Sequence, residues 1–254
     1  MARRNVEKKP IGHFPRPHIY LLIILYNMDL LETLRRRAVV GHRGYPAREL
    51  ENTLQSIEAA IAHGADAVEV DVQVTADGVA VLSHDDTLER TFGLPLNVRQ
   101  AAWEEVKKVE RGRYRVPTLR EALELVAERV GVLVEVKHPE DAHIVARTIR
   151  EAGAARWTAV ISFHEEALRG VDLYRGLIYA KPPGRVVDAK RLGCHIVLPH
   201  HALATERAVA LAHKMGLYVV AWTVNSPATA RRLWEIGVDG VATDDVENIK
   251  AVLS

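Results

Sequence analysis

The sequence predicts an α/β fold in which eight strands, each followed by a helix, close into a single (β/α)8 barrel. From Ala38 onward, short runs rich in β-branched residues alternate with segments of helical periodicity, which is typical of repeated βα units and a parallel sheet. Glycines stand between a helical segment and the next strand, where helices commonly end in a residue of left-handed conformation. These glycines are Gly64, Gly131, Gly153, Gly216 and Gly237. A length of 254 residues suits one barrel domain.

The elements are expected in this order. The predicted strands are Ala38–Gly41, Ala67–Val74, Val132–Lys137, Ala159–Ser162, Gly176–Ala180, His195–Leu198, Tyr218–Trp222 and Gly240–Thr243. The predicted helices are Leu50–His63, Leu119–Arg129, Asp141–Ala152, Glu165–Leu173, Val186–Leu192, Thr205–Met215, Pro227–Ile236 and Val246–Leu253. The segment Asp85–Pro117 carries no strand of this series, and we interpret it as an elaborated βα loop over the barrel mouth, with a helix at Ala101–Val109.

The overall charge gives no reason to expect nucleic acid as a partner. Lys and Arg total 34 and Asp and Glu total 33, for a net charge of +1. The content of 48% hydrophobic residues is enough for a full core. A single cysteine, Cys194, excludes an intramolecular disulfide and a cysteine metal site, which suits a cytoplasmic protein. The sequence does not indicate the oligomeric state.

Residues 1–37 differ in pattern from the rest. They combine a basic start, three prolines and the apolar run Ile19–Tyr26. That run is too short to span a bilayer, which needs about 20 residues, and no small-residue cleavage site of an export signal follows it. We therefore expect an N-terminal extension at 1–37, disordered or loosely docked and without a stable membrane span, ahead of a barrel at 38–254. A natural start at Met28 is one explanation of this segment.

The stretch Glu69–His84 is the most informative part of the chain for function. Glu69 and Asp71 alternate with valines, which places both carboxylates on one face of a strand. Neighbouring acids on a buried strand require a cation or a basic partner. A turn at Ala76–Gly78 then returns the chain as a second short strand that ends at His84. The alternative is a pair of solvent-facing acids on an edge hairpin, which has the same alternation.

Other strand ends carry polar residues as well. The first strand ends in His42 and Arg43 between two glycines, which offers proton transfer and a planar group for an anion. The third contains Glu135 and Lys137 on one face. In barrels the chemistry lies at the carboxyl ends of the strands. Three carboxylates from adjacent strands match the hard oxygen ligands of Mg²⁺ or Ca²⁺ better than those of zinc.

These motifs together resemble the glycerophosphodiester phosphodiesterase family. In order along the chain they are HRG, ENT, ExD, HDxxLxRT, ExK and WTVN, and they extend from Val40 to about Asn248. The resemblance implies a TIM barrel of the phospholipase-C-like kind. It also implies that a divalent cation, Mg²⁺ or Ca²⁺, helps to cleave a small-molecule glycerophosphodiester into sn-glycerol 3-phosphate and an alcohol.

The resemblance also implies roles for individual residues. Glu69, Asp71 and Glu135 are implied as metal ligands, and His42 and His84 as the acid/base pair. It further implies that the phosphate is surrounded by Arg43, Asn52 and Lys137 and that the pocket is lined by Trp222. The sequence departs from the family pattern at Phe92, where a threonine is usual, and after Asp244, where a proline is common.

Two other functions are compatible with the sequence. The first is a lysophospholipase D that acts on a lipid with one acyl chain, which would need an apolar approach to the barrel mouth. Phe92, Leu94, Pro95 and Leu96 are the candidates for that approach. The second is a non-catalytic barrel that only binds phosphorylated ligands, which we disfavour because every position that the family chemistry needs is occupied.

Overall fold

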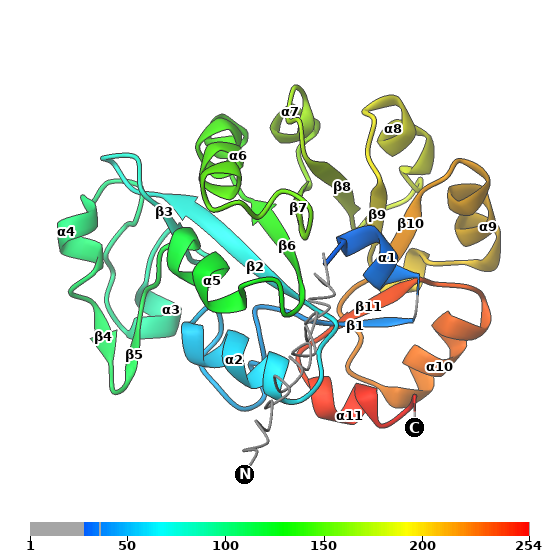
Figure 1. Cartoon of the computed structure of the whole chain (residues 1–254), viewed down its shortest axis with the longest axis horizontal. Helices are drawn as coiled ribbons and strands as arrows, with labels where there is room; N and C mark the ends of the chain where they lie inside the picture. The colour runs from blue at the N-terminus through cyan, green and yellow to red at the C-terminus, as the bar shows by residue number, and fades with distance from the viewer. Residues whose placement is uncertain (1–27, 36, 254) are drawn as a thin grey trace, which may run out of the picture.

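The computed structural model describes residues 28–35 and 37–253, and its central feature is a closed barrel of eight parallel strands (Figure 1). The strands are β1 (Ala38–Gly41), β2 (Ala67–Val74), β6 (Gly131–Val136), β7 (Thr158–Ser162), β8 (Tyr174–Tyr179), β9 (Ile196–Pro199), β10 (Tyr218–Ala221) and β11 (Gly240–Thr243). Neighbours in sequence are neighbours in the sheet, and β1 closes the barrel by pairing with both β11 and β2. The predicted fold class is confirmed.

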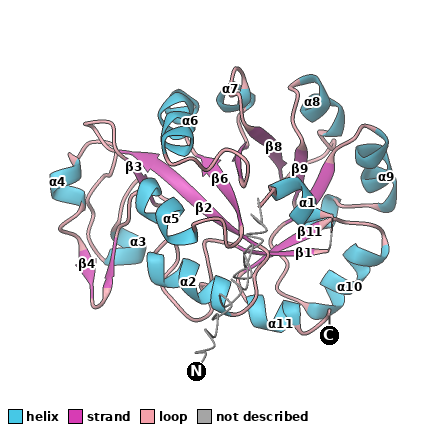
Figure 2. Cartoon of the chain, in the orientation of Figure 1, coloured by secondary structure: helices cyan, strands magenta, loops and turns pink. Residues whose placement is uncertain are grey.

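Helices surround the barrel on its outside (Figure 2). They are α2 (Leu54–Ala62), α5 (Leu119–Val126), α6 (Ala142–Glu151), α7 (Glu165–Leu168), α8 (Val186–Arg191), α9 (Glu206–Lys214), α10 (Pro227–Glu235) and α11 (Val246–Lys250), with short 3-10 turns at Pro139–Asp141 and His201–Leu203. Buried side chains form one core between strands and helices and a second core inside the barrel. The strands are therefore buried on both faces, which explains their nearly continuous apolar sequence.

A short helix, α1 (Leu30–Leu34), packs into the barrel core (Figure 1). Asp29 caps it by accepting a hydrogen bond from the Leu31 amide at 3.0 Å. Leu30 and Leu34 are fully buried with strand residues such as Leu133. For residues 28–35 the expectation of a disordered or loosely docked extension is therefore wrong, because two leucines of this segment complete the core. Residues 1–27, with the apolar run Ile19–Tyr26, lie outside the described residues.

Gly131 illustrates the effect of α1 on the sequence. A left-handed cap was expected there, but Ala127 and Glu128 take the positive φ angles of that connection, 45° and 65°. At Gly131 a Cβ atom would lie 2.5 Å from Leu30 Cδ1. Glycine is therefore needed at this position for close packing against Leu30 rather than for a left-handed backbone.

The segment Asp85–Pro117 forms an elaborate βα connection, as predicted. It follows β3 (Ala80–Leu82), which pairs antiparallel with β2, and it contains α3 (Glu89–Phe92), α4 (Trp103–Val106) and the hairpin of β4 (Glu110–Arg111) and β5 (Tyr114–Arg115). It has a small core of its own, which includes Leu88, Val98 and Val106. This core holds the segment in a defined position beside the end of β2.

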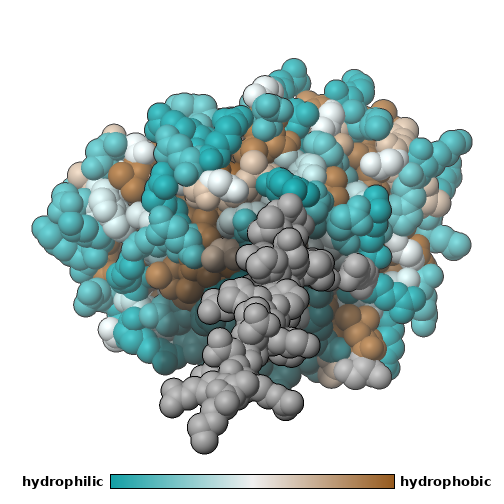
Figure 3. Space-filling view, in the orientation of Figure 1, coloured by the Kyte–Doolittle hydropathy of each residue, from teal (hydrophilic) through white to brown (hydrophobic). Residues whose placement is uncertain are grey.

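The face seen in Figure 3 is largely hydrophilic, with scattered hydrophobic residues. Within residues 28–35 and 37–253, no helix combines the length and the apolar character needed to cross a membrane.

Candidate active site at the carboxyl ends of the strands

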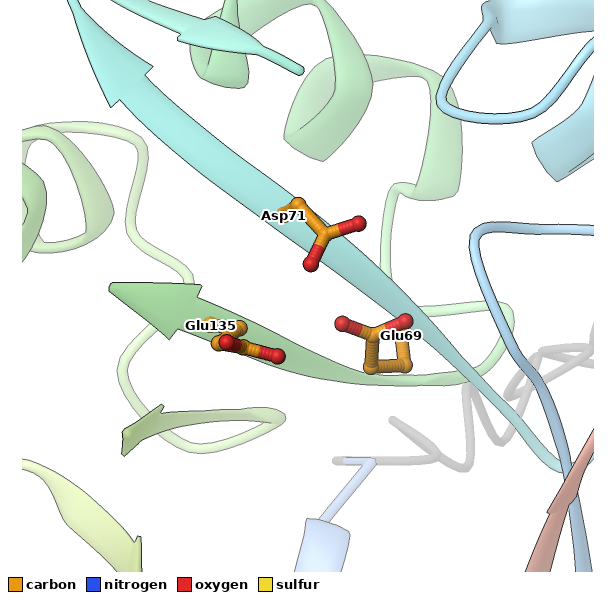
Figure 4. Close-up of side chains that lie close together, drawn as sticks. All are labelled: Glu69, Asp71 and Glu135. Atoms are coloured by element: carbon orange, nitrogen blue, oxygen red, sulfur yellow. The ribbon is translucent and has the colours of Figure 1, made fainter. Parts of the chain in front are cut away.

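Three carboxylates converge where β2 and β6 run side by side (Figure 4). Asp71 pairs with Glu135 in the parallel register, and Glu69 lies two residues earlier on the same face of β2. One oxygen of each carboxylate lies within 4.8 Å of the other two. Glu69 and Asp71 are buried, and only 12% of the Glu135 side chain is exposed. The solvent-facing alternative for the hairpin is therefore excluded.

The charge in this cluster is only partly balanced. Burial and the charge of Asp71 raise the pKa of Glu69 to about 8. Burial alone would also raise the pKa of Asp71, but the charges of Lys137 and Arg43 lower it to about 2. Glu69 Oε1 is buried without a hydrogen-bond partner. An unpartnered carboxylate oxygen facing two further carboxylates fits a hard divalent cation, which takes oxygen ligands of this kind.

Two basic side chains border the cluster. Lys137 Nζ lies 2.6 Å from Asp71 Oδ1 and 2.7 Å from Glu135 Oε1. Arg43 Nε lies 3.2 Å from Asp71 Oδ2, and the Arg43 amide donates to Glu69 Oε2 at 3.0 Å. Arg43 has a φ angle of 56°, a left-handed conformation that is uncommon for a residue with a side chain.

Asn52 contacts Asp71 with both ends of its side-chain amide. Its side-chain amide donates to Asp71 Oδ2 at 2.8 Å, and its side-chain oxygen accepts from the Asp71 amide at 3.1 Å. It is buried and does not line the cavity at the barrel mouth. The observed contacts of Asn52 are thus with Asp71, and the phosphate contact that the resemblance implies stays a prediction.

His42 and His84 line the same cavity, which has a volume of about 170 Å³. His42 Nδ1 lies 2.7 Å from Asp244 Oδ1, and His84 Nδ1 lies 2.6 Å from Asp85 Oδ1. Each imidazole is thus paired with a carboxylate through one nitrogen, which leaves Nε2 for the cavity. Burial alone would lower the pKa of His42, but the hydrogen bond to Asp244 and the charge of Glu69 raise it.

The cavity has a polar side and an apolar side. The polar side holds His42, Arg43, Glu69, His84, Glu135 and Lys137, and the apolar side holds Leu133, Ile161, Phe163, Ile178, Leu198, Trp222 and Ala242. Trp222 directly follows β10 on the apolar side. Its indole N–H donates to the Leu198 carbonyl at 2.9 Å, and its ring contacts Phe163 edge to face. The apolar side comes mainly from β6 to β11, which the motifs did not indicate.

Two carboxylates of the site were not identified from the sequence. Asp244 holds His42 and accepts a hydrogen bond from the Asn225 side chain at 2.7 Å, and Asp85 holds His84. Their positions gave a usable signal, because Asp244 follows the last barrel strand at its carboxyl end and Asp85 is adjacent to His84.

Comparison with known proteins gives a consistent result. The model of a family described as "Glycerophosphoryl diester phosphodiesterase family" matches residues 42–248. A glycerophosphodiester phosphodiesterase of Caldanaerobacter subterraneus is 30% identical over 233 residues, which cover 83% of this chain and 95% of that protein. A putative glycerophosphodiester phosphodiesterase of Bacillus subtilis is 29% identical over 228 residues, covering 81% and 93%.

Solved structures show the same architecture. A putative glycerophosphoryl diester phosphodiesterase from Silicibacter pomeroyi has a TM-score of 0.81 at 27% identity, covering 88% of this chain and 96% of that one. An Oleispira antarctica phosphodiesterase in complex with the product sn-glycerol-3-phosphate has a TM-score of 0.78 at 25% identity, covering 86% and 97%. The similarity thus extends over the barrel and the candidate site.

Proposed function

We propose that this chain, which belongs to the glycerophosphoryl diester phosphodiesterase family, cleaves its substrate at the carboxylate cluster with one divalent cation. The chain is an enzyme, a phosphoric diester hydrolase that converts a glycerophosphodiester into sn-glycerol 3-phosphate and an alcohol. We also propose that this reaction depends on a metal and that the residues lining the cavity carry it out. The observation that carries these proposals is the convergence of Glu69, Asp71 and Glu135 beside two imidazoles in one cavity.

Glu69, Asp71 and Glu135 would hold the cation, either Mg²⁺ or Ca²⁺. When bound, such a cation neutralises charge on a non-bridging phosphate oxygen and acidifies the attacking hydroxyl. Asn52 keeps Asp71 in place by its two hydrogen bonds. Lys137 and Arg43 line the same cavity and supply positive charge for the phosphate.

His42 and His84 supply the proton transfers. Cleavage forms a bond from phosphorus to the attacking oxygen and breaks the bond to the alcohol oxygen. One imidazole takes the proton of the attacking hydroxyl, and the other gives a proton to the leaving oxygen, so that the two transfers balance. Asp244 and Asp85 each hold Nδ1 of one imidazole, which orients Nε2 for this task.

An assay of the purified protein with and without a chelator tests the proposal. Glycerophosphocholine and glycerophosphoethanolamine should be hydrolysed, and activity lost to the chelator should return with Mg²⁺ or Ca²⁺. Glu135→Gln should require more cation for the same rate, because one ligand charge is lost. Full activity of chelated wild type would contradict the role of the metal.

We also propose a cytoplasmic location, which the single cysteine supports.

The apolar side of the cavity favours a second candidate activity, that of a lysophospholipase D. Phe163 lines the cavity and is 37% exposed at its rim, where an acyl chain could enter. Phe92, Leu94 and Leu96, the candidates from sequence, line a separate groove instead, in the inserted segment Asp85–Pro117. Turnover of lysophosphatidylcholine in the same assay, lowered in Phe163→Ser with glycerophosphocholine turnover retained, would support this activity.

A further inference from the structure

A chain of charged side chains runs from His84 to the carboxylate cluster. Asp85 accepts from His84 through Oδ1 at 2.6 Å, and its second oxygen accepts from Arg90 Nε at 2.6 Å. Arg90 also donates two parallel hydrogen bonds to Glu51, at 2.7 and 2.8 Å. Glu51 in turn accepts from Arg43 at 2.9 Å.

The contacts of Arg90 use its whole guanidinium group. Nε faces Asp85, and the two terminal nitrogens face Glu51. This two-sided, planar arrangement is specific to arginine, because a lysine ammonium cannot make both contacts with fixed geometry. Arg90 belongs to α3 of the inserted segment, whereas Glu51 belongs to the loop after β1. One side chain therefore ties the inserted segment to the barrel next to the site.

The backbone of His84 is already held without Arg90. The Gln73 side chain donates to the His84 carbonyl at 3.3 Å and to Asp86 at 3.1 Å. The side chain of Asp85, by contrast, is 34% exposed and has Arg90 as its second partner. Arg90 consequently restrains the carboxylate that orients His84.

We propose that Arg90 is a positioning residue for His84, which it orients through Asp85, while Glu51 holds the other side of its guanidinium group. Arg90 does not line the cavity, and Asp85 and Glu51 occupy its guanidinium group, so it acts through Asp85 on the imidazole. Its side chain is 50% exposed and that of Glu51 is 16% exposed, so the loss of Arg90 should lower folding stability only modestly. The arrangement accordingly affects turnover more than folding. This inference rests on the proposed role of His84 as an acid/base group.

The test is a double-mutant cycle on the metal-loaded enzyme with glycerophosphocholine as substrate. Asp85→Asn should lower kcat about 10²-fold, as expected when a histidine loses its orienting carboxylate. Arg90→Gln should lower kcat about tenfold, with KM within about twofold of wild type and a thermal midpoint only a few degrees lower, so that the enzyme stays folded at the assay temperature. The double variant should be no slower than Asp85→Asn, because residues that act in series are not additive. Arg90→Lys, which keeps the charge but loses the fork, should lie between wild type and Arg90→Gln.

Arg129→Gln is the matched control. Arg129 also makes two hydrogen bonds to one glutamate, Glu58, and is 41% exposed, but it precedes β6 at the amino end of the strands and does not line the cavity. The kcat of Arg129→Gln should equal that of wild type.

If His84→Ala is inactive, the proposed function stands, and either of two results would still overturn the inference about Arg90. The first is a wild-type kcat in Arg90→Gln. The second is a double variant in which the losses of Asp85→Asn and Arg90→Gln multiply. Wild-type turnover in His84→Ala would overturn the proposed function, and this inference with it.

Discussion

At the scale of single residues, the two imidazoles of the cavity carry the first prediction. His42→Ala and His84→Ala should each lower turnover about 10²–10⁴-fold, because each removes one of the two proton transfers. Cation affinity should change little, since neither histidine belongs to the carboxylate cluster. Steady-state kinetics and a cation titration of the two variants measure these outcomes.

His213 provides the control for that experiment. It pairs with Asp239 at 2.8 Å, the same kind of contact as in the site, but Asp239 precedes β11 and lies at the opposite end of the barrel from the cavity. His213→Ala should therefore keep wild-type turnover. Near-normal turnover in both His42→Ala and His84→Ala would contradict the proposed mechanism.

Asp244→Asn carries the second prediction. Asp244 helps to raise the pKa of His42 against the effect of burial, so removal of its charge should lower that pKa. The limb of the pH–rate profile that reports His42 should then move to lower pH, whether His42 acts as base or as acid. Turnover should also fall about 10²–10⁴-fold, because the imidazole loses its orienting partner. A profile that keeps its position would contradict this pairing.

These residues show what the sequence could and could not predict about the site. Period-two spacing on β2 and β6 was enough to bring Glu69, Asp71 and Glu135 together, because parallel register places their side chains on one face. The partner of His42 lies 202 positions away, and such a contact exists only once the barrel has closed. Asn52 was assigned by motif alone, so its contact with Asp71 could not be seen.

At the scale of elements, α1 leads to the third prediction. Leu30 is fully buried and packs against Gly131, so Leu30→Ala should lower the free energy of unfolding by about 2–5 kcal/mol. Leu211 on α9 is 38% exposed, and Leu211→Ala should change the free energy of unfolding by no more than about 0.5 kcal/mol. Denaturant unfolding of the two variants measures the difference. Equal stabilities would show that α1 does not complete the core.

Truncation extends this prediction. Removal of residues 1–27 should leave folding and activity nearly intact, since those residues contain none of the motifs of the site. Removal of residues 1–35 should lower the thermal midpoint, because it also removes Leu30 and Leu34 from the core. Aggregation or inactivity of the shorter deletion would show that the first 27 residues have a structural role.

The strands were easier to predict than the ends of the helices and the added elements. Ala38–Gly41, Ala67–Val74 and Gly240–Thr243 agree with β1, β2 and β11 to the residue, because each is a compact, fully buried run. The helix expected from Leu50 begins only at Leu54, because Thr53 caps it and Asn52 takes a left-handed conformation. A five-residue helix such as α1 shows too little periodicity to be found.

At the scale of the whole molecule, the carboxylate cluster links stability to pH. Glu69 has a pKa of about 8 in the folded protein against an ordinary value of 4.5. Between these values the folded state binds a proton that the unfolded state has released, so stability falls as pH rises. The raised pKa values of Glu135 and His42 act in the same direction. The lowered pKa of Asp71, about 2, matters only at more acidic pH.

The last prediction follows from this decrease in stability with rising pH. In the presence of a chelator, the thermal midpoint should fall between pH 5 and pH 8, and Mg²⁺ or Ca²⁺ should restore it more at pH 8 than at pH 5, because cation binding requires ionised carboxylates. Glu69→Gln should flatten the pH dependence of the chelated protein, since the amide has no proton to release. Thermal unfolding of both proteins across this range measures the effect. If the thermal midpoint of the chelated wild type rises with pH instead, Glu69 is not buried in its protonated form when the cation is absent, and the prediction is wrong.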